Sequence, residues 1–493
     1  MPDVISYTNL GLYGFGYVPA ICHGYSDLLS SAIYIDSRTA RNCKVEEWIQ
    51  HSINHEYRMS WMPLEVSLGQ LSYSTISSAL PYAPLSIVFS IARFVKNNGY
   101  IPVPQIDELL YMSQRTHLCE LRASELLYFA SQCYSFFLAY LHCAKLKVII
   151  STEIPHHFTD YILCLACKTL GIPFVSQINQ AITHSALFLD FSSSRFLPNT
   201  SEYGMNACRA QDLEDFILKY SARGNPLIPR KGLSVYDEGG LDLSSITSSN
   251  IRTFLTSGTE KSMSILSRLY DSAKFFDSLA QKRPAPAYVN GTKHYFFAHL
   301  QPEATTSPMC GKWVDHRFCL AELSKTIGED DIILYKEHPN QFRFLPLMDG
   351  SDFHISNVYS IKDATYYSSL VSIPNVYLLS RFVSVDEIFM QPNIKIWSPN
   401  GTVSLEAFLA GKDVGFFDTL SPWRALYDKY IDEGNGGLSL LVFARNYLQQ
   451  LSWPMIISDL YLINHDIYSN SLAFRAKALG ELVYCIAKCS FSD

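Results

Sequence analysis

Over residues 123 to 177, segments whose apolar positions follow a helical period alternate with short apolar runs typical of strands. A long apolar helix precedes the β-branched run Leu146 to Ser151, and a second helical pattern at Phe158 to Leu170 precedes a strand that starts at Ile172. Gly171 separates this helix from the strand. Such alternation predicts parallel strands joined by right-handed crossovers. This segment is therefore expected to form half of a Rossmann-like domain.

The same alternation returns, more clearly, from residue 294 to residue 417. Strands are expected at 294–298, 331–335, 375–379, 394–397 and 414–417, and helices at 313–326, about 361–370, 385–390 and 403–409. Residues 1–122 carry a weaker pattern, with strands expected near 32–35 and 86–89. The glycines of 11–19 are interpreted as a plain loop, because Pro19 stands where a nucleotide-binding helix would propagate.

The chain of 493 residues exceeds one ordinary core, so two domains are expected. A stretch richer in Ser, Gly and charge, including a helix expected at 260–281, separates them. The expected organisation is an acceptor-side domain at 1–240, a linker and connecting helix at 241–285, a nucleotide-sugar domain at 286–430 and a helical segment at 431–493. In that last segment, helices near 438–450 and 471–488 are expected to pack back across the domains.

Composition narrows the classes of function. A net charge of −7 without a long run of Lys or Arg argues against nucleic acid as a partner. The amino terminus lacks a basic stretch followed by an apolar one, so a cytoplasmic location is expected. The uncharged run Leu126 to Ala144 is interpreted as a buried helix rather than a membrane span. Cys164 and Cys167 fall within a helical pattern without a second pair at zinc spacing, which favours reduced core thiols.

Polar groups follow several expected strands of the second domain. In the sequence KEHP, His338 and Lys336 can donate to a phosphate, although a loop histidine bonded within the protein is an equal reading. In NGTVSLEA, Gly401 makes a turn, and Thr402 or Ser404 begins a helix with Glu406 in its first turn. A helix start of this kind suits phosphate as well as ordinary capping.

Two further segments offer acid and base groups. QPEATTSP places Gln301, Glu303 and Thr305 after a strand, and Glu303 there is a candidate general base. STEIPHHFTDY places His156 and Asp160 at the start of a helix in the first domain, where they suit an acceptor-side base. Both segments also have structural readings, and no ligand spacing favours a metal. Asp330 and Asp331 precede a strand, on the side of the sheet away from ligands, and are interpreted as a solvated turn.

These motifs together resemble the bacterial capsule polysaccharide biosynthesis glycosyltransferases. The resemblance rests on QPEATTSP, KEHP, the PNV of 374–376 and NGTVSLEAFLAGK, in this order, and on IPHHFTDYILCLACKTLGIPF in the first domain. It implies the GT-B arrangement: an α/β protein whose two Rossmann-like domains face each other across a cleft, with C-terminal helices packing back. Relatives include transferases of Kdo from its CMP-linked form.

The resemblance also implies roles. Lys336, His338, Gly401, Thr402, Ser404, Gln301 and Thr305 would bind the nucleotide sugar; Glu303, His156 and Asp160 would be catalytic. No metal and no cofactor is implied, since the nucleotide sugar is a substrate. The implied acceptor is a glycan or a lipid-linked molecule, and the latter would bring the protein to the inner face of the membrane. Thr305 and Thr306 stand where the Kdo transferases are expected to carry further acidic residues, so a covalent aspartate mechanism is not carried over.

Two other functions are open on the sequence. One is a polyol-phosphate transferase of the teichoic-acid type, which shares a histidine-proline motif. The other is a polysaccharide-assembly partner that keeps the fold without turnover.

Overall fold

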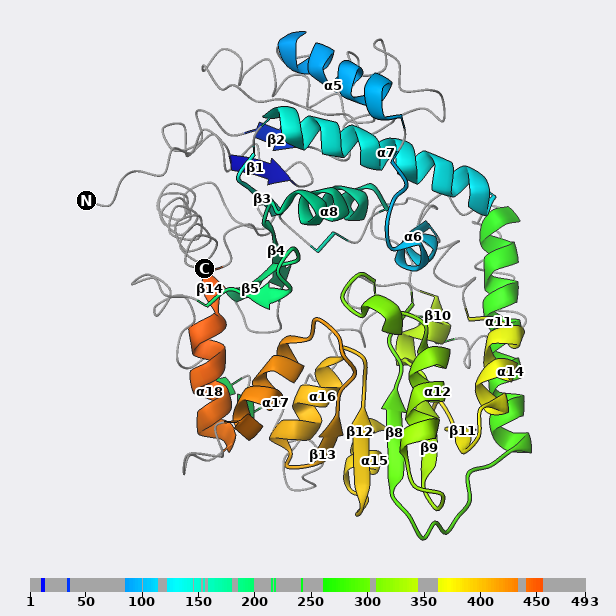
Figure 1. Cartoon of the computed structure of the whole chain (residues 1–493). Coiled ribbons are helices and arrows are strands. Elements are labelled where there is room, and N and C mark those ends of the chain that lie inside the picture. The colour runs from blue at the N-terminus through cyan, green and yellow to red at the C-terminus, as the bar shows by residue number, and fades with distance from the viewer. Residues whose placement is uncertain are drawn as a thin grey trace. The chain divides into compact units, whose positions relative to one another are not determined.

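The computed structural model describes part of the chain, shown in colour in Figure 1. The described residues are 10–13, 33–35, 85–99, 101–113, 122–144, 146–151, 154–155, 158–179, 185–198, 214–215, 217–218, 241–242, 260–301, 307–344, 362–432 and 440–454. The chain divides into two compact units. Unit 1 comprises residues 1–106, 121–214 and 444–493, and unit 2 comprises residues 107–120 and 215–443.

Unit 1 is built on a mixed sheet with a parallel centre. Its order is β14-β5-β4-β3-β1-β2, with β6 paired to β5. Strands β2, β1, β3 and β4 run parallel to one another, and β5 turns antiparallel. The strands are β1 (Leu10–Tyr13), β2 (Ile33–Ile35), β3 (Val148–Ser151), β4 (Phe174–Asn179), β5 (Ser185–Asp190), β6 (Arg195–Phe196) and β14 (Trp453–Pro454). Through β14 the chain returns to this first sheet after passing through unit 2.

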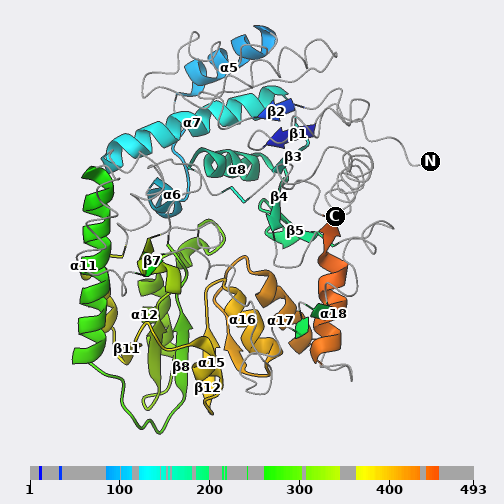
Figure 2. The same cartoon turned by 180° about the vertical axis from the view of Figure 1, so that it is seen from behind.

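Three helices of unit 1 pack in sequence, as Figures 1 and 2 both show: α5 (Leu85–Asn98), α7 (Ala123–Ala144) and α8 (Phe158–Leu170). The apolar length of α7 is used for packing, because Phe136, Phe137 and Tyr140 are almost fully buried. Among the described residues, no helix is both long enough and apolar enough to cross a membrane. The interpretation of 126–144 as a buried helix is confirmed.

Unit 2 holds a fully parallel sheet in the order β11-β9-β8-β12-β13. Its strands are β8 (Lys293–Phe297), β9 (Ile332–Lys336), β11 (Val376–Leu378), β12 (Ile394–Trp397) and β13 (Asp413–Gly415). A separate two-stranded pair joins β7 (Leu241–Asp242) to β10 (Arg343–Phe344). Numbered by position in the chain, the sheet order is 3-2-1-4-5, which is a Rossmann order.

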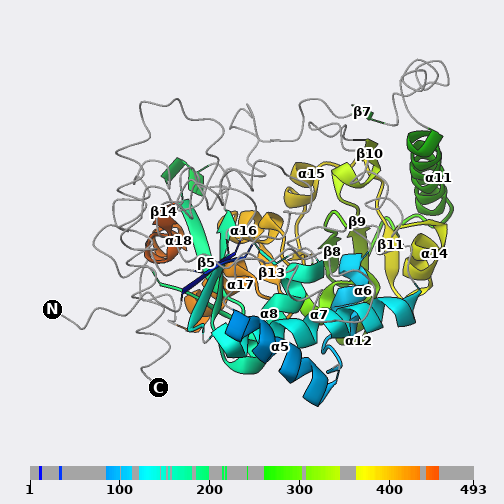
Figure 3. The same cartoon turned by 90° about the horizontal axis from the view of Figure 1, so that it is seen from above.

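Helices cover this sheet, as Figure 3 shows from above. They include α11 (Glu260–Lys282), α12 (His316–Thr326), α14 (Ala364–Ser372) and α16 (Thr402–Leu409). The other helical segments of this part of the chain are α6 (Ile106–Ser113), η5 (Gly311–Trp313), η6 (Pro339–Phe342), α15 (Val385–Phe389), α17 (Pro422–Asp432) and α18 (Leu440–Leu451), of which α18 belongs mostly to unit 1. Phe276 of α11 contacts Tyr367 of α14 with ring centroids 5.0 Å apart. Both rings belong to the hydrophobic core of unit 2. Ile333 and Tyr335, which are alternate residues of β9, belong to the same core, because successive side chains of a strand point to opposite faces of the sheet.

The α/β class with two Rossmann-like sheets is confirmed, and the expected strands of 294–417 all form. The strand expected near 86–89 is wrong: these residues lie within α5, whose apolar positions continue with a helical period to residue 95. The plain loop expected at 11–19 is also wrong in its first residues, because Gly11, Leu12 and Tyr13 belong to β1, between β2 and β3. The helix expected near 438–450 forms as α18, while 471–488 lies outside the described residues.

Candidate functional site

The carboxyl ends of β8 and β12 meet at the one place in the unit 2 sheet where the direction of the crossovers reverses. β8 leads to β9 on one side, and β12, its neighbour on the other side, leads to β13. In open α/β sheets such a switch point forms the crevice that holds the ligand. The residues that follow β8 and β12 are therefore the first candidates for a binding site.

His299 joins these two strand ends. It lies two residues after β8, and its Nε2 atom is 3.0 Å from the hydroxyl of Ser398, the first residue after β12. The backbone N–H of Asn400 also donates to Nε2, at 3.1 Å. Because Nε2 accepts this bond, His299 is a neutral imidazole with its proton on Nδ1. Burial, reinforced by the charges of His338 and Lys362, lowers the pKa of His299 to about 3, in agreement.

Gly401 completes this turn and begins α16. Its N–H donates to the Ser398 hydroxyl at 3.1 Å. A Cβ atom on Gly401 would lie 2.7 Å from that hydroxyl oxygen and 3.3 Å from Nε2 of His299. The turn therefore has room for glycine only.

No side chain caps the start of α16, because its N-cap residue is Gly401. The expected capping by Thr402 or Ser404 is wrong: Thr402 is exposed, and the hydroxyl of Ser404 is buried and makes no hydrogen bond. Glu406 lies beyond the first turn, which holds no acidic residue. An uncapped helix start leaves N–H donors and a positive dipole end, and both favour an anion such as phosphate.

The turn after β9 is held by a buried ion pair. Nζ of Lys362 donates to the carboxylate of Glu337 at 2.8 Å and to the carbonyl of His299 at 2.9 Å, and both charged side chains are fully buried. The same carboxylate accepts the hydroxyls of Tyr335 (3.0 Å) and Tyr367 (2.8 Å) and the N–H of His338 (2.8 Å). This network fixes the backbone of His338 and ties it to the residue that bridges β8 and β12.

His338 itself is half-buried at this edge, whereas Lys336 is buried. Nζ of Lys336 donates to the carbonyl of Arg381 at 2.8 Å. Burial lowers the pKa of Lys336 to about 8, against the opposing effect of Glu337 and Glu387. Lys336 thus links β9 to the loop that follows β11, and it carries its charge only below about pH 8.

Several buried polar atoms on the segment after β8 make no hydrogen bond. His316, the first residue of α12, is fully buried with both ring nitrogens unpaired, and its ring lies 5.9 Å from that of His299, centroid to centroid. Burial, followed by the charge of Lys362, holds the pKa of His316 well below its usual value. The side-chain oxygens of Gln301 and Ser307 are unpaired as well. Each unpaired buried group costs about 1–3 kcal/mol, so these atoms favour a polar ligand that pairs with them.

Of the other predicted site residues, only Gln301 lies at this site in the described part of the chain. Gln301 is buried and donates its N–H to Gln341 at 3.1 Å. Glu303, Thr305 and His156 lie outside the described residues. Asp160 lies in the first turn of α8 in unit 1 and is fully buried.

Sequence reasoning missed His299, Ser398 and the Glu337–Lys362 pair. His299 and Ser398 closely follow strands, so their position was a usable signal, but the register that joins them depends on strand order. Lys362 is 25 residues from Glu337 in the chain, and no sequence pattern links the two.

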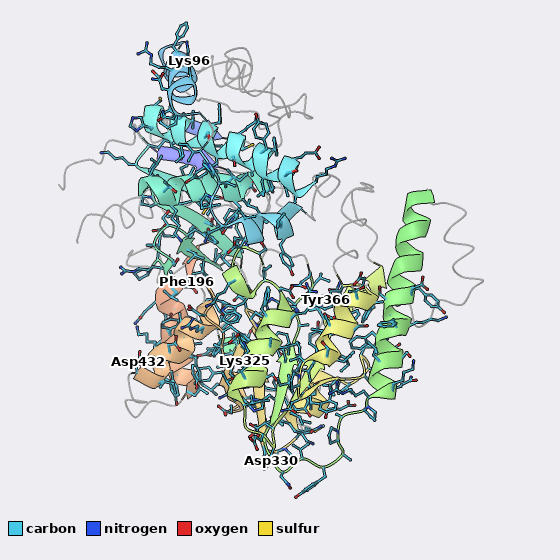
Figure 4. The ribbon with its side chains drawn as sticks, turned by 45° about the vertical axis from the view of Figure 1, so that its right-hand side comes forward. Lys96, Phe196, Lys325, Asp330, Tyr366 and Asp432 are labelled. Carbon is cyan, nitrogen blue, oxygen red and sulfur yellow. The ribbon has the colours of Figure 1, made fainter. Side chains whose placement is uncertain are left out.

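The opposite edge of the unit 2 sheet carries a structural turn. Figure 4 shows Asp330 at the far end of the unit from Tyr366. Asp331 accepts the N–H groups of Thr292 (2.6 Å) and Gly328 (2.9 Å) and lies 3.1 Å from Nε2 of His294. Asp331 therefore joins the starts of β8 and β9 and is more than a solvated turn residue.

Among the residues that the structure describes, no group of three or more His, Cys, Asp or Glu side chains is placed to hold a metal ion. The thiols of Cys164 and Cys167 are buried in α8. Burial raises the pKa of both thiols. They are core residues, as expected.

No protein-family model and no curated protein matches this sequence. Among solved structures, the chain is similar to KpsC, a β-Kdo 2,7-transferase from Thermosulfurimonas dismutans, with 11% identity, a TM-score of 0.27, and coverage of 67% of this chain and 84% of that one. It is also similar to a UDP-GlcNAc 2-epimerase from Neisseria meningitidis, with 12% identity, a TM-score of 0.21, and coverage of 97% and 99%. The corresponding epimerase from Methanocaldococcus jannaschii has 9% identity, a TM-score of 0.20, and coverage of 96% and 99%. The assignment of the fold rests on the sheet order and not on these scores.

Proposed function

We propose that this protein is a glycosyltransferase that takes a sugar from a nucleotide donor, and that unit 2 binds the donor at the ends of β8, β9 and β12. The observation that carries the proposal is the junction of His299, Ser398 and Gly401 at the switch point of a 3-2-1-4-5 parallel sheet. That position is where nucleotides bind in sheets of this order.

The chemistry of the junction supports a phosphate ligand. The start of α16 supplies N–H donors and the buried hydroxyl of Ser404. The imidazole of His338 stands at the same edge, on a backbone fixed by Glu337. Hydrogen bonds from such groups to phosphate are strong because the acceptor is charged.

The proposed donor is a CMP-linked acidic sugar such as Kdo, and the proposed acceptor is a glycan or a lipid-linked molecule used in surface polysaccharide synthesis. The support is the likeness of KEHP and NGTVSLEA to the capsule polysaccharide glycosyltransferases. In this proposal, Glu303, His156 and Asp160 are the candidate catalytic residues, and the base among them takes the proton of the acceptor hydroxyl. That step moves one proton from the acceptor oxygen to the base as the new glycosidic bond forms and the nucleotide leaves.

Calorimetry with CMP, UMP, UDP and GDP tests the nucleotide site. We expect one nucleotide to bind, and His338→Gln to weaken it about 10- to 150-fold, the loss for one hydrogen bond to a charged group. The matched control is His142→Gln, since His142 is exposed on α7 in unit 1. If no nucleotide binds the folded protein, the proposed function fails.

Product analysis with CMP-linked sugars and with CDP-linked polyols then identifies the reaction. A glycosyltransferase releases CMP from a CMP-linked sugar and leaves the product free of phosphorus from the donor. Release of CMP from a CDP-linked polyol, with the second phosphorus retained in the product, would instead identify a polyol-phosphate transferase. Nucleotide binding without turnover on any acceptor would indicate an assembly partner.

A further inference from the structure

The loop between β11 and α15, residues 379–384, is held at this same edge of the sheet by bonds to β9. The N–H of Leu379 donates to the carbonyl of Tyr335 at 2.9 Å, and the carbonyl of Arg381 accepts Nζ of Lys336. At the far end of the loop, Ser384 forms a capping box with Glu387 at the start of α15. The loop is thus anchored at its start, its middle and its end.

An aromatic side chain projects from this anchored loop. Phe382 is 64% exposed, yet the guanidinium carbon of Arg381 lies 4.6 Å from its ring centroid. Nε of Arg381 donates in turn to Asp277 of α11 at 3.2 Å. The ring is therefore held in place by a cation–π contact while most of its surface faces solvent.

The position of Phe382 separates it from the other exposed apolar side chains of unit 2. In the described part of that unit, Leu218, Phe318, Ile431, Leu441 and Val442 have helical backbone, Met390 ends α15, and Tyr288 precedes β8 at the amino edge of the sheet. Phe382 is the one that follows a strand at its carboxyl end. Single exposed apolar residues need no explanation in general, but this one stands in a loop that Lys336 ties to the end of β9.

We infer that Phe382 is the stacking platform for the base of the nucleotide. Neighbouring strands lie about 4.8 Å apart, and β9 and β8 lie between β11 and β12, so the end of β11 is about 14 Å from the end of β12, which α16 follows. A nucleotide with its phosphate at the start of α16 and its sugar over the ends of β8 and β9 extends toward β11, which brings its base to the loop that carries Phe382. Base–aromatic stacking tolerates any base, because every base offers a π face. Phe382 would thus contribute affinity for any base, and the backbone groups around it would determine which base binds.

This inference rests on the proposed function, and its test separates the two. Calorimetry compares CMP with ribose 5-phosphate, which has the phosphate and the sugar without the base, on the full-length wild-type chain and on Phe382→Leu. We expect the substitution to weaken CMP about 5- to 150-fold, the range that base–aromatic stacking contributes. Ribose 5-phosphate should bind both proteins equally. If another nucleotide is the one that binds wild type, that nucleotide replaces CMP.

Two further variants guard against indirect effects. Phe382→Trp should retain the affinity, and its added fluorescence should be quenched by the nucleotide and not by ribose 5-phosphate. Tyr288→Leu is the matched control, because Tyr288 is 81% exposed at the amino edge of the same sheet. Equal nucleotide affinity of wild type and Phe382→Leu overturns the platform and leaves the proposed function intact. An equal loss for nucleotide and ribose 5-phosphate also overturns it, whereas failure of every nucleotide to bind wild type overturns the function as well.

Discussion

Replacing Lys362 by Met tests how strongly the buried ion pair supports the site. The substitution removes one cation and leaves the Glu337 carboxylate with three donors: two tyrosine hydroxyls and the N–H of His338. Both charged side chains are fully buried, so water does not replace the lost partner. Breaking a buried pair from one side costs about 3–5 kcal/mol.

The double variant Glu337→Gln with Lys362→Met should cost less than Lys362→Met alone. It removes both charges, so no carboxylate is left buried without its cation. Replacement of a whole buried pair by neutral groups is often nearly neutral, and we therefore expect the double variant to recover about 2 kcal/mol of the loss. Lys325→Met, at the exposed pair with Glu322, is the control and should change stability by about 0.5 kcal/mol or less.

Native-state hydrogen exchange of the β9 amides, 332–336, measures these differences within unit 2. A bulk unfolding curve is less suitable, because a chain of two units need not unfold in one step. If Lys362→Met costs less than about 1 kcal/mol, or the double variant costs as much as the single one, the charge-pair reasoning is wrong.

Three other predictions concern residues at the carboxyl ends and at the amino ends of the strands of the unit 2 sheet. Gly401→Ala should cost about 1–3 kcal/mol and abolish nucleotide binding measured by calorimetry, because its Cβ would lie 2.7 Å from the Ser398 hydroxyl. Because burial lowers the pKa of Lys336 to about 8, nucleotide affinity should fall as pH rises from about 7 to about 9, and Lys336→Gln should flatten that titration. Burial by itself would raise the pKa of Asp331. Hydrogen bonds from Thr292, Gly328 and His294 outweigh burial, so the pKa of Asp331 is lowered. The stability that Asp331 contributes is therefore present above about pH 4 and lost as pH falls through its lowered pKa. The difference in free energy of unfolding between wild type and Asp331→Asn should consequently become smaller in acid. A difference that does not change with pH would contradict this.

Much of the fold was predictable because its signals are local. In residues 294–417 the strands are short apolar runs and the helices begin at polar residues, so each element can be recognised within a few positions. The amino-terminal part was harder: the apolar run at 86–89 suits a strand or a buried helix, and only its continuation to residue 95 decides for α5. The strand at Leu10–Tyr13 was hidden by its glycine, and its pairing with β3 is a contact between residues far apart in the chain.

The sequence by itself determined that polar motifs follow strands, because the apolar runs and the histidine and glycine turn that come after them can be recognised from the order of residues alone. The tertiary structure decided which of them meet. Strand order places β8 beside β12, so His299 bonds to Ser398 and Asn400 across about 100 residues. It also decided protonation, because burial and neighbouring charges keep His299 neutral, and burial lowers the pKa of Lys336. Register and burial are properties of the packed chain, and no local pattern carries them.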